Sequence, residues 1–156
     1  MIRYVKRAAL VFVLATTAFA GCGGDVDPAT TPAGRAQVDY LEDIYNGRFG
    51  QAYAVLHPAY KQVVSRTQFS DCAASTIPVG QLDSIEVLDV FDDPVEIPGE
   101  GEQQAKAVRV RITSTDGQSV TFKKPPHEVE VGDKWYWVLN AAAVKAYKAG
   151  TCPGSG

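Results

Sequence analysis

Three cysteines and two histidines are the side chains of this 156-residue chain that are best suited to chemistry. Because the cysteines number three, at least one of Cys22, Cys72 and Cys152 cannot join an internal disulfide. His57 precedes a proline and His127 follows two, positions typical of a locally bonded or solvent-facing histidine rather than a catalytic base. Their separation gives no zinc-ligand spacing. We therefore expect no catalytic residue, no metal and no cofactor.

The N-terminus has the three-part layout of a secretory signal. Arg3, Lys6 and Arg7 precede an uncharged run at residues 8–20, which closes on small residues. This run is shorter than the ~20 predominantly apolar residues that span a bilayer. We interpret residues 1–21 as a cleaved signal peptide, with an uncleaved membrane anchor as the alternative.

The cleavage site itself is more specific. Phe19-Ala20-Gly21-Cys22 resembles the lipobox of bacterial lipoproteins, which is a bulky apolar residue, two small residues and then Cys. The resemblance implies that Cys22 receives a diacylglyceryl group and that its new amino group is acylated, for example with palmitate. Two or more acyl chains hold a protein on a bilayer stably. An ordinary secreted protein that keeps a cysteine near its cleavage site is the alternative.

The segment after Cys22 is rich in Gly, Pro, Thr and Asp and has no periodic apolar positions. This composition predicts a flexible tether, so residues 22–35 are expected to link the lipid to a domain at residues 36–156. The localisation expected is the extracytoplasmic face of a bacterial membrane.

Removing residues 1–21 leaves twelve Lys and Arg against eighteen Asp and Glu, and changes the formal charge from −3 to −6. This balance argues against nucleic acid as a partner. The partners expected are the membrane, reached through the lipid anchor, and a small apolar ligand or an envelope protein.

With Cys22 carrying lipid, Cys72 and Cys152 have one possible pairing. Thiols outside the cytoplasm are oxidised, so we expect a disulfide between them. It would close a loop of about 80 residues, for which the chain-entropy model gives ~4 kcal/mol of stabilisation. Two free structural cysteines, or a catalytic thiol, are the alternatives.

Helical spacing dominates the first half of the domain. Apolar residues recur at helical intervals over 37–45, and further helical segments are expected at 49–56 and 59–64. Ser65 and Gln68 fit a capping box, which predicts another helix with Phe69 facing inward and Cys72 near its end. A short helix at 140–150, capped by Asn140, is expected to close the chain.

The pattern alternates in the second half. Strands are expected at residues 84–91, 106–113, 118–123, 127–131 and 134–140, with hairpin turns at Asp116-Gly117 and Gly132-Asp133. Val108, Val110 and Ile112 should share one face of their strand, with the intervening arginines opposite. The acidic run at 92–102 is expected to be a solvated loop. Helices followed by four or more antiparallel strands indicate the α+β class.

Two segments carry a resemblance. "YLEDIYNGRFGQAYAVLHPAYKQVVSRTQF" (40–69) and "VGDKWYWVLN" (131–140) resemble the nuclear transport factor 2-like superfamily, also called the ketosteroid isomerase-like or cystatin-like fold. The resemblance implies a curved antiparallel sheet wrapped round the N-terminal helices, with a cone-shaped cavity. The candidates for lining it are aromatic: Tyr45, Tyr53, Phe69, Trp135 and Trp137. Ordinary core packing is the favoured role for these five side chains, and lining the cavity is the alternative.

The sequence therefore predicts a lipid-anchored, extracytoplasmic, non-catalytic binding or interaction module of the cell envelope. An isomerase-type or hydrolase-type enzyme that uses the cone is the alternative function. The superfamily serves both classes, so the fold alone does not choose between them.

Overall fold

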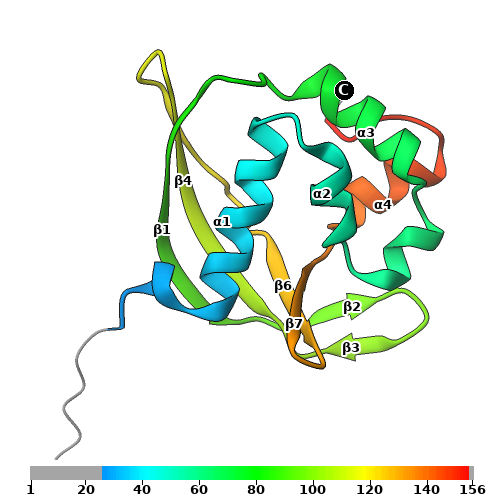
Figure 1. Cartoon of the computed structure of the whole chain (residues 1–156). Helices are drawn as coiled ribbons and strands as arrows, with labels where there is room; N and C mark the ends of the chain where they lie inside the picture. Colours follow the sequence, from blue (N-terminus) through cyan, green and yellow to red (C-terminus); the bar gives the residue numbers. More distant parts are fainter. Residues whose placement is uncertain (1–25, 155–156) are drawn as a thin grey trace, which may run out of the picture.

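The computed structural model describes residues 26–154 (Figure 1). The expected signal peptide and Cys22 lie outside this range. Within it, no helix combines the length and the apolar character that a bilayer-spanning segment requires.

The helical elements precede and follow the sheet, as the sequence pattern predicted. They are η1 (Pro28–Thr30), α1 (Pro32–Tyr45), α2 (Phe49–Ala54), η2 (Pro58–Gln62), α3 (Arg66–Thr76) and α4 (Ala141–Lys148), where η denotes a 3-10 helix.

Helix α1 starts earlier than its apolar spacing indicated. The Thr31 hydroxyl accepts a hydrogen bond from the Gly34 N–H at 3.0 Å, and Pro32 occupies the first helical position, where its fixed φ suits a helix. Together with η1, this cap brings ordered structure into the stretch whose composition indicated a flexible tether. The ordered domain thus begins before residue 36, where the sequence analysis had placed its boundary.

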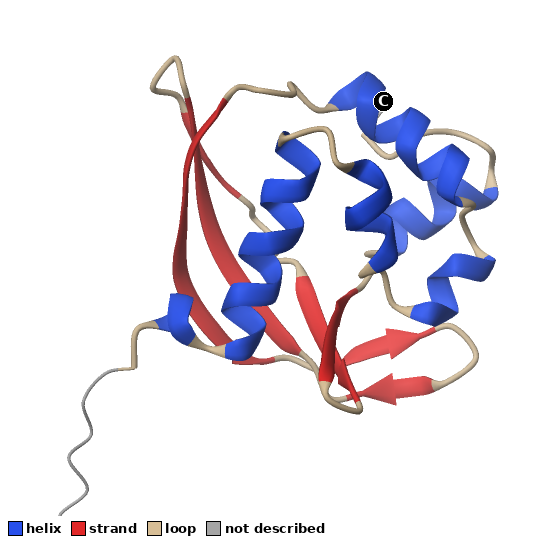
Figure 2. Ribbon diagram, viewed as in Figure 1, coloured by secondary structure: helices blue, strands red, loops and turns tan. Residues whose placement is uncertain are grey.

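A five-stranded antiparallel sheet forms the second layer (Figure 2). Its strands are β1 (Leu82–Asp92), β4 (Lys106–Ser114), β5 (Ser119–Thr121), β6 (His127–Val131) and β7 (Lys134–Trp137). The order is β1-β4-β6-β7, and β5 pairs with β4. The α+β prediction is confirmed.

The acidic run is not the solvated loop that was expected. It contains a separate hairpin of β2 (Val95–Ile97) and β3 (Gly101–Gln103). Ile97 is fully buried and belongs to the larger core cluster. The Pro and Gly residues of the run are compatible with a hairpin because Pro94 precedes β2, Pro98 and Gly99 lie between the strands, and Gly101 is the first residue of β3.

Helix α1 lies across one face of the sheet (Figure 1). Ala33 and Leu41 of α1 pack there against Val108, Val110 and Ile112 of β4. Arg109 and Arg111 are exposed on the opposite face, so the predicted alternation along β4 is confirmed.

The other end of the sheet is covered on both faces. Glu128 and Val129 are neighbours on β6, so their side chains point to opposite faces, yet both are buried. Val129 belongs to the same core cluster as Tyr60 of η2 and Ile97 of β2. The Tyr60 hydroxyl donates to the Glu96 carbonyl at 3.4 Å, which ties η2 to the small hairpin.

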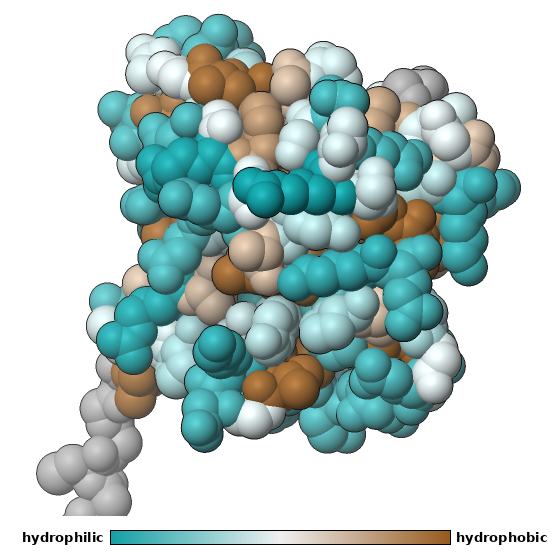
Figure 3. All heavy atoms as spheres, turned by 45° about the vertical axis from the view of Figure 1, so that its right-hand side comes forward, coloured by the Kyte–Doolittle hydropathy of each residue, from teal (hydrophilic) through white to brown (hydrophobic). Residues whose placement is uncertain are grey.

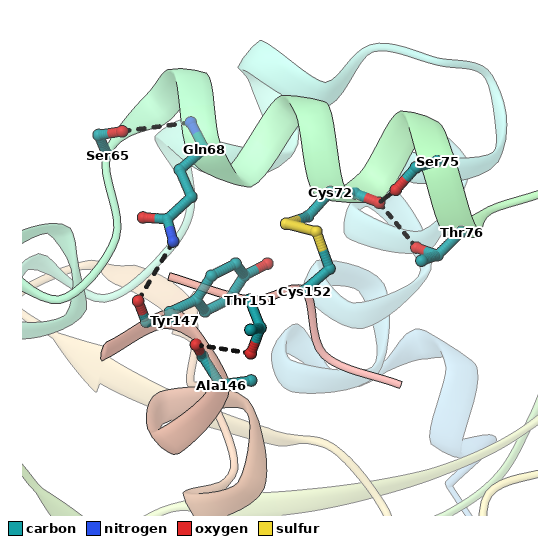
Figure 4. Close-up of a disulfide and its surroundings, with 9 residues drawn as sticks. All are labelled: Ser65, Gln68, Cys72, Ser75, Thr76, Ala146, Tyr147, Thr151 and Cys152. Atoms are coloured by element: carbon teal, nitrogen blue, oxygen red, sulfur yellow. Dashed lines mark hydrogen bonds between the residues drawn. A yellow bond between two sulfur atoms is a disulfide. The ribbon is translucent and has the colours of Figure 1, made fainter. Parts of the chain in front are cut away.

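The chain's C-terminal tail is fastened to α3 (Figure 4). A disulfide joins Cys72 to Cys152, the pairing that the sequence analysis expected, with an S–S distance of 2.01 Å. Ser65 caps α3 by accepting the Gln68 N–H at 3.2 Å, as predicted. The Gln68 side-chain amide donates to the Tyr147 carbonyl at 3.2 Å, so α3 and α4 are also linked without the disulfide.

Candidate ligand-binding cavities

A cavity of about 610 Å³, here called cavity A, lies between α1 and β7. Its wall includes Arg35, Asp39 and Tyr40 of α1, Glu128 of β6, and Trp135 and Trp137 of β7. The volume falls within the range of sites that hold small molecules, and aromatic rings with a few polar groups are the usual lining of such sites.

A smaller cavity of about 220 Å³, cavity B, lies among α1, α3 and α4. Ile44, Phe69, Leu139 and Ala143 contribute apolar side chains to its wall. The disulfide cysteine Cys72 lines it as well.

Two aromatic side chains belong to both walls. Tyr40 and Trp137 line cavity A and cavity B, and their ring centroids are 4.3 Å apart at an interplanar angle of 31°. The Trp137 indole N–H donates to the Ala52 carbonyl at 3.2 Å, which fixes that ring in place. We call this tilted ring pair, which both linings share, the partition between the two cavities.

Glu128 is the unusual residue of cavity A. Its side chain is 1% exposed, and its Oε1 atom has no hydrogen-bond partner among the described residues. Lys106 lies directly opposite Glu128 across the β4–β6 pairing, but its ammonium group instead donates to Asp92 at 2.7 Å. The carboxyl group of Glu128 is thus buried without an ion pair to any described residue, although a lysine lies opposite it in the sheet.

Burial raises the pKa of Glu128 well above the ordinary value of 4.5. The cause is desolvation, which disfavours the charged form. A protonated carboxyl group carries one O–H donor and retains acceptor capacity, so Glu128 can donate a hydrogen bond into cavity A.

Gln37 adds a second unsatisfied side chain to the contact between α1 and the sheet. It is completely buried, and neither its amide nitrogen nor its amide oxygen has a partner among the described residues. Buried polar groups of native proteins are normally hydrogen-bonded. Gln37 lies one helical turn from both Ala33 and Leu41 of the core cluster over β4, and it does not line cavity A.

The tyrosines around the partition remain protonated. Burial, followed by the neighbouring Tyr147 and Glu128, raises the pKa of Tyr40 above its ordinary value. Burial likewise raises the pKa of Tyr147 to about 12. Tyr40 therefore lies close to Glu128 of cavity A and to Tyr147 of cavity B, and presents a hydroxyl group rather than a phenolate.

Neither histidine lines cavity A or cavity B. His57 is 2% exposed, which corrects the expectation of a solvent-facing residue, while its Nδ1 accepts the Ala59 N–H at 3.3 Å in the expected local bond. Burial lowers the pKa of His57. His127 lies at the start of β6, with Nε2 2.8 Å from Asp93 Oδ2.

The five aromatic candidates separate into two groups. Trp135 lines cavity A, Phe69 lines cavity B, and Trp137 lines both. Tyr45 and Tyr53 pack against the core, where the Tyr53 hydroxyl donates to the Val64 carbonyl at 3.0 Å.

Sequence reasoning missed Tyr40 and Glu128 in the wall of cavity A, and it missed Gln37, which is buried on α1 but lines neither cavity. The sequence does contain a sign that Gln37 and Tyr40 face the interior. Each lies four residues before a buried apolar residue of α1, Leu41 and Ile44 respectively, and therefore on the same face of the helix. Among residues 26–154, no three His, Cys, Asp or Glu side chains gather as a metal site would require.

Comparison with known proteins does not assign this chain to a family. No family model matches this chain, and neither does any curated protein or any solved structure. Its function must therefore be argued from its own residues.

Proposed function

We propose that this protein is a non-catalytic binding module that holds a small, uncharged, largely apolar ligand in cavity A. The observation that carries the proposal is Glu128, a buried carboxyl group without a partner in the wall of an aromatic-lined cavity of ligand size.

The chemistry of Glu128 selects an uncharged ligand. A protonated carboxyl group can donate to an acceptor oxygen of the ligand, which supplies the partner that the protein itself lacks. A charged group at the same depth would have to lose its hydration, at a cost that only a paired opposite charge repays. An alcohol, ketone or amide oxygen meets no such cost.

The surface favours a small ligand over an envelope protein as the partner. On the face that Figure 3 brings forward, hydrophobic areas are small and separated by hydrophilic ones. Protein interfaces are usually built on larger continuous apolar patches. Apolar and aromatic side chains line both cavities, which supports a small ligand as the partner.

The proposed location rests on the lipobox-like sequence that ends at Cys22. Lipid on Cys22 would place the domain on the extracytoplasmic face of the membrane. Metabolic labelling with a fatty acid tests this: label on the wild-type protein should disappear in Cys22→Ser. Equal labelling of the two proteins would refute the anchor.

We further propose that the domain has the cone-shaped fold of the nuclear transport factor 2-like superfamily. The support is the element order, with α1, α2 and α3 before the antiparallel sheet, and the position of cavity A between α1 and the strands β6 and β7. An experimental structure of the chain, compared with members of that superfamily, tests this part of the proposal.

An isomerase-type or hydrolase-type enzyme is the second candidate, and Glu128 is the observation that favours it. A buried carboxyl group with a raised pKa is suited to general acid catalysis. Binding alone is the better-supported function because neither histidine lines cavity A, and no described residue is hydrogen-bonded to Glu128 to exchange its proton.

Fluorescence can test the binding proposal directly. The chain has two tryptophans, Trp135 and Trp137, and both line cavity A. Titrating the mature chain carrying Cys22→Ser with hexan-1-ol should change its tryptophan emission saturably.

Variants of Glu128 then test the hydrogen bond. Glu128→Gln keeps a donor and should bind like the parent, whereas Glu128→Leu should bind about tenfold more weakly, as expected for one lost hydrogen bond. Glu130→Gln, at an exposed position of β6, is the matched control. The proposal fails if hexan-1-ol leaves the emission unchanged, or if Glu128→Leu binds as tightly as Glu130→Gln.

A further inference from the structure

We propose that cavities A and B are two compartments of one binding site, which takes an elongated, uncharged ligand with a polar end and an apolar tail. The polar end meets Glu128 in cavity A, and the tail passes Tyr40 into cavity B. This inference rests on the proposed function of cavity A and deepens it, because it names the shape and class of the ligand.

The shared wall is the first observation. Only the ring pair of Tyr40 and Trp137, with centroids 4.3 Å apart, is common to the described linings of the two cavities. We infer that the cavities join by rotation of one of these side chains, without movement of a strand or helix backbone.

The two partition residues are held unequally. Trp137 is fixed by its indole hydrogen bond to Ala52, by its backbone N–H to the Val55 carbonyl at 3.1 Å, and by its strand pairing with Glu128. Tyr40 projects from a helix, and no described residue is hydrogen-bonded to its hydroxyl group. Rotation about the Tyr40 χ1 angle, between the two rotamers common in helices, is therefore the movement that opens the wall.

The chemistry of the two compartments differs in a way that orients the ligand. Cavity A carries Glu128 at its buried end and the charged Arg35, Asp39 and Lys134 elsewhere in its wall. The wall of cavity B is mostly apolar, with Ile44 and Phe69 among its side chains, and suits a hydrocarbon segment. An alcohol with a straight alkyl chain is the simplest compound with both properties.

The far wall of cavity B is held covalently. Cys72 and Pro153 both line it, and the disulfide from Cys72 to Cys152 fixes the residue next to that proline. The tail that is tied to α3 thus forms part of the wall of cavity B, and the volume of about 220 Å³ limits how much of the alkyl chain the cavity admits.

A series of straight-chain alcohols from hexan-1-ol to dodecan-1-ol tests the inference by tryptophan fluorescence. Each additional methylene that enters an apolar cavity should tighten binding about fourfold until cavity B is full. Ala143→Leu places a larger side chain in cavity B and should reduce the affinity for dodecan-1-ol to near that for hexan-1-ol. Ala142→Leu, at an exposed position of α4, is the matched control.

A second variant acts in the opposite direction. Tyr40→Ala removes the movable half of the partition, and it should raise the affinity for dodecan-1-ol about tenfold relative to the affinity for hexan-1-ol. A cooperative urea-unfolding transition shows that each variant is folded. If Ala143→Leu does not fold, the series measured with Tyr40→Ala decides the question.

The outcomes separate the two proposals. If no alcohol changes the emission of the parent protein, the proposed function of cavity A fails. If hexan-1-ol binds, but affinity does not rise with chain length and Ala143→Leu equals Ala142→Leu, cavity A acts alone and the joint site is refuted.

Discussion

Helix α1 covers two halves of one sheet, and the halves are built differently. Over β1 and β4 it packs apolar side chains on apolar side chains, with Val108 and Val110 completely buried. Over β6 and β7 it leaves cavity A and buries Glu128 without a partner. We call these the packed half and the cavity half.

Under the proposed function, one small domain separates stability from binding. Close packing removes apolar surface from water and leaves no room for a ligand. A cavity with an unsatisfied carboxyl group costs free energy, which the rest of the fold must offset. In this molecule the offset has two sources: the packed half, and the disulfide that ties α3 to the tail beside cavity B.

The largest effect is expected from removing that disulfide. The double variant Cys72→Ala/Cys152→Ala should lower the free energy of unfolding by ~4 kcal/mol, because the bridge spans 80 residues of sequence and restricts the unfolded chain. Urea unfolding with and without reductant measures this. Reductant should destabilise the parent and leave the double variant unchanged. If the urea midpoints of the parent and the double variant are identical, the disulfide does not stabilise the fold.

The next effect concerns the pH dependence of the cavity half. Because the pKa of Glu128 is raised by burial, the folded state binds its proton more tightly than the unfolded state does. Its contribution to stability is complete below the ordinary value of 4.5 and is lost as the pH rises through the raised value. Glu128→Gln does not titrate, so its unfolding free energy should fall less over this range.

The experiment is urea unfolding of the parent and of Glu128→Gln at several pH values from below 4.5 upward. Glu130→Gln removes an exposed carboxyl group of the same strand and should keep the parent's pH profile. Parallel profiles for the parent and Glu128→Gln would mean that Glu128 titrates as an exposed residue does, which would remove the basis of the binding proposal.

A smaller effect is expected in the packed half. Val110→Ala should cost about 2 kcal/mol, because the deleted methyl groups leave a space that the surrounding strands cannot fill. The neighbouring variant Arg111→Ala removes an exposed ion pair with Glu86 and should cost less than about 0.5 kcal/mol. Neither variant should change hexan-1-ol binding. Weakened binding in Val110→Ala would show that the halves are not independent.

The packed half could be predicted from the sequence. In β4, Val108, Val110 and Ile112 alternate with arginines because only one face of that strand is covered, and a period of two reports this burial directly. The cap of α3 at Ser65 was equally visible, because capping is a local interaction.

The cavity half could not be predicted in the same way. In "HEVEV" the alternation suggests that only one face of the strand is buried. However, Val129 belongs to a core cluster with residues of η2 and β2, and Glu128 lines cavity A together with residues of α1. Burial of Glu128 thus depends on elements distant in sequence, which no local pattern reports. The burial of Ile97 could not be predicted either, because its acidic and proline-rich neighbours are typical of a loop.

The early start of α1 has a consequence for where a ligand would come from. Pro32, the first residue of α1, is also part of the wall of cavity A. About ten residues separate it from Cys22, so an extended chain between them reaches at most ~35 Å. If Cys22 carries lipid, this short connection keeps the wall of cavity A at Pro32 near the bilayer surface. An amphiphile leaving the membrane would then have little water to cross before it reached the protein.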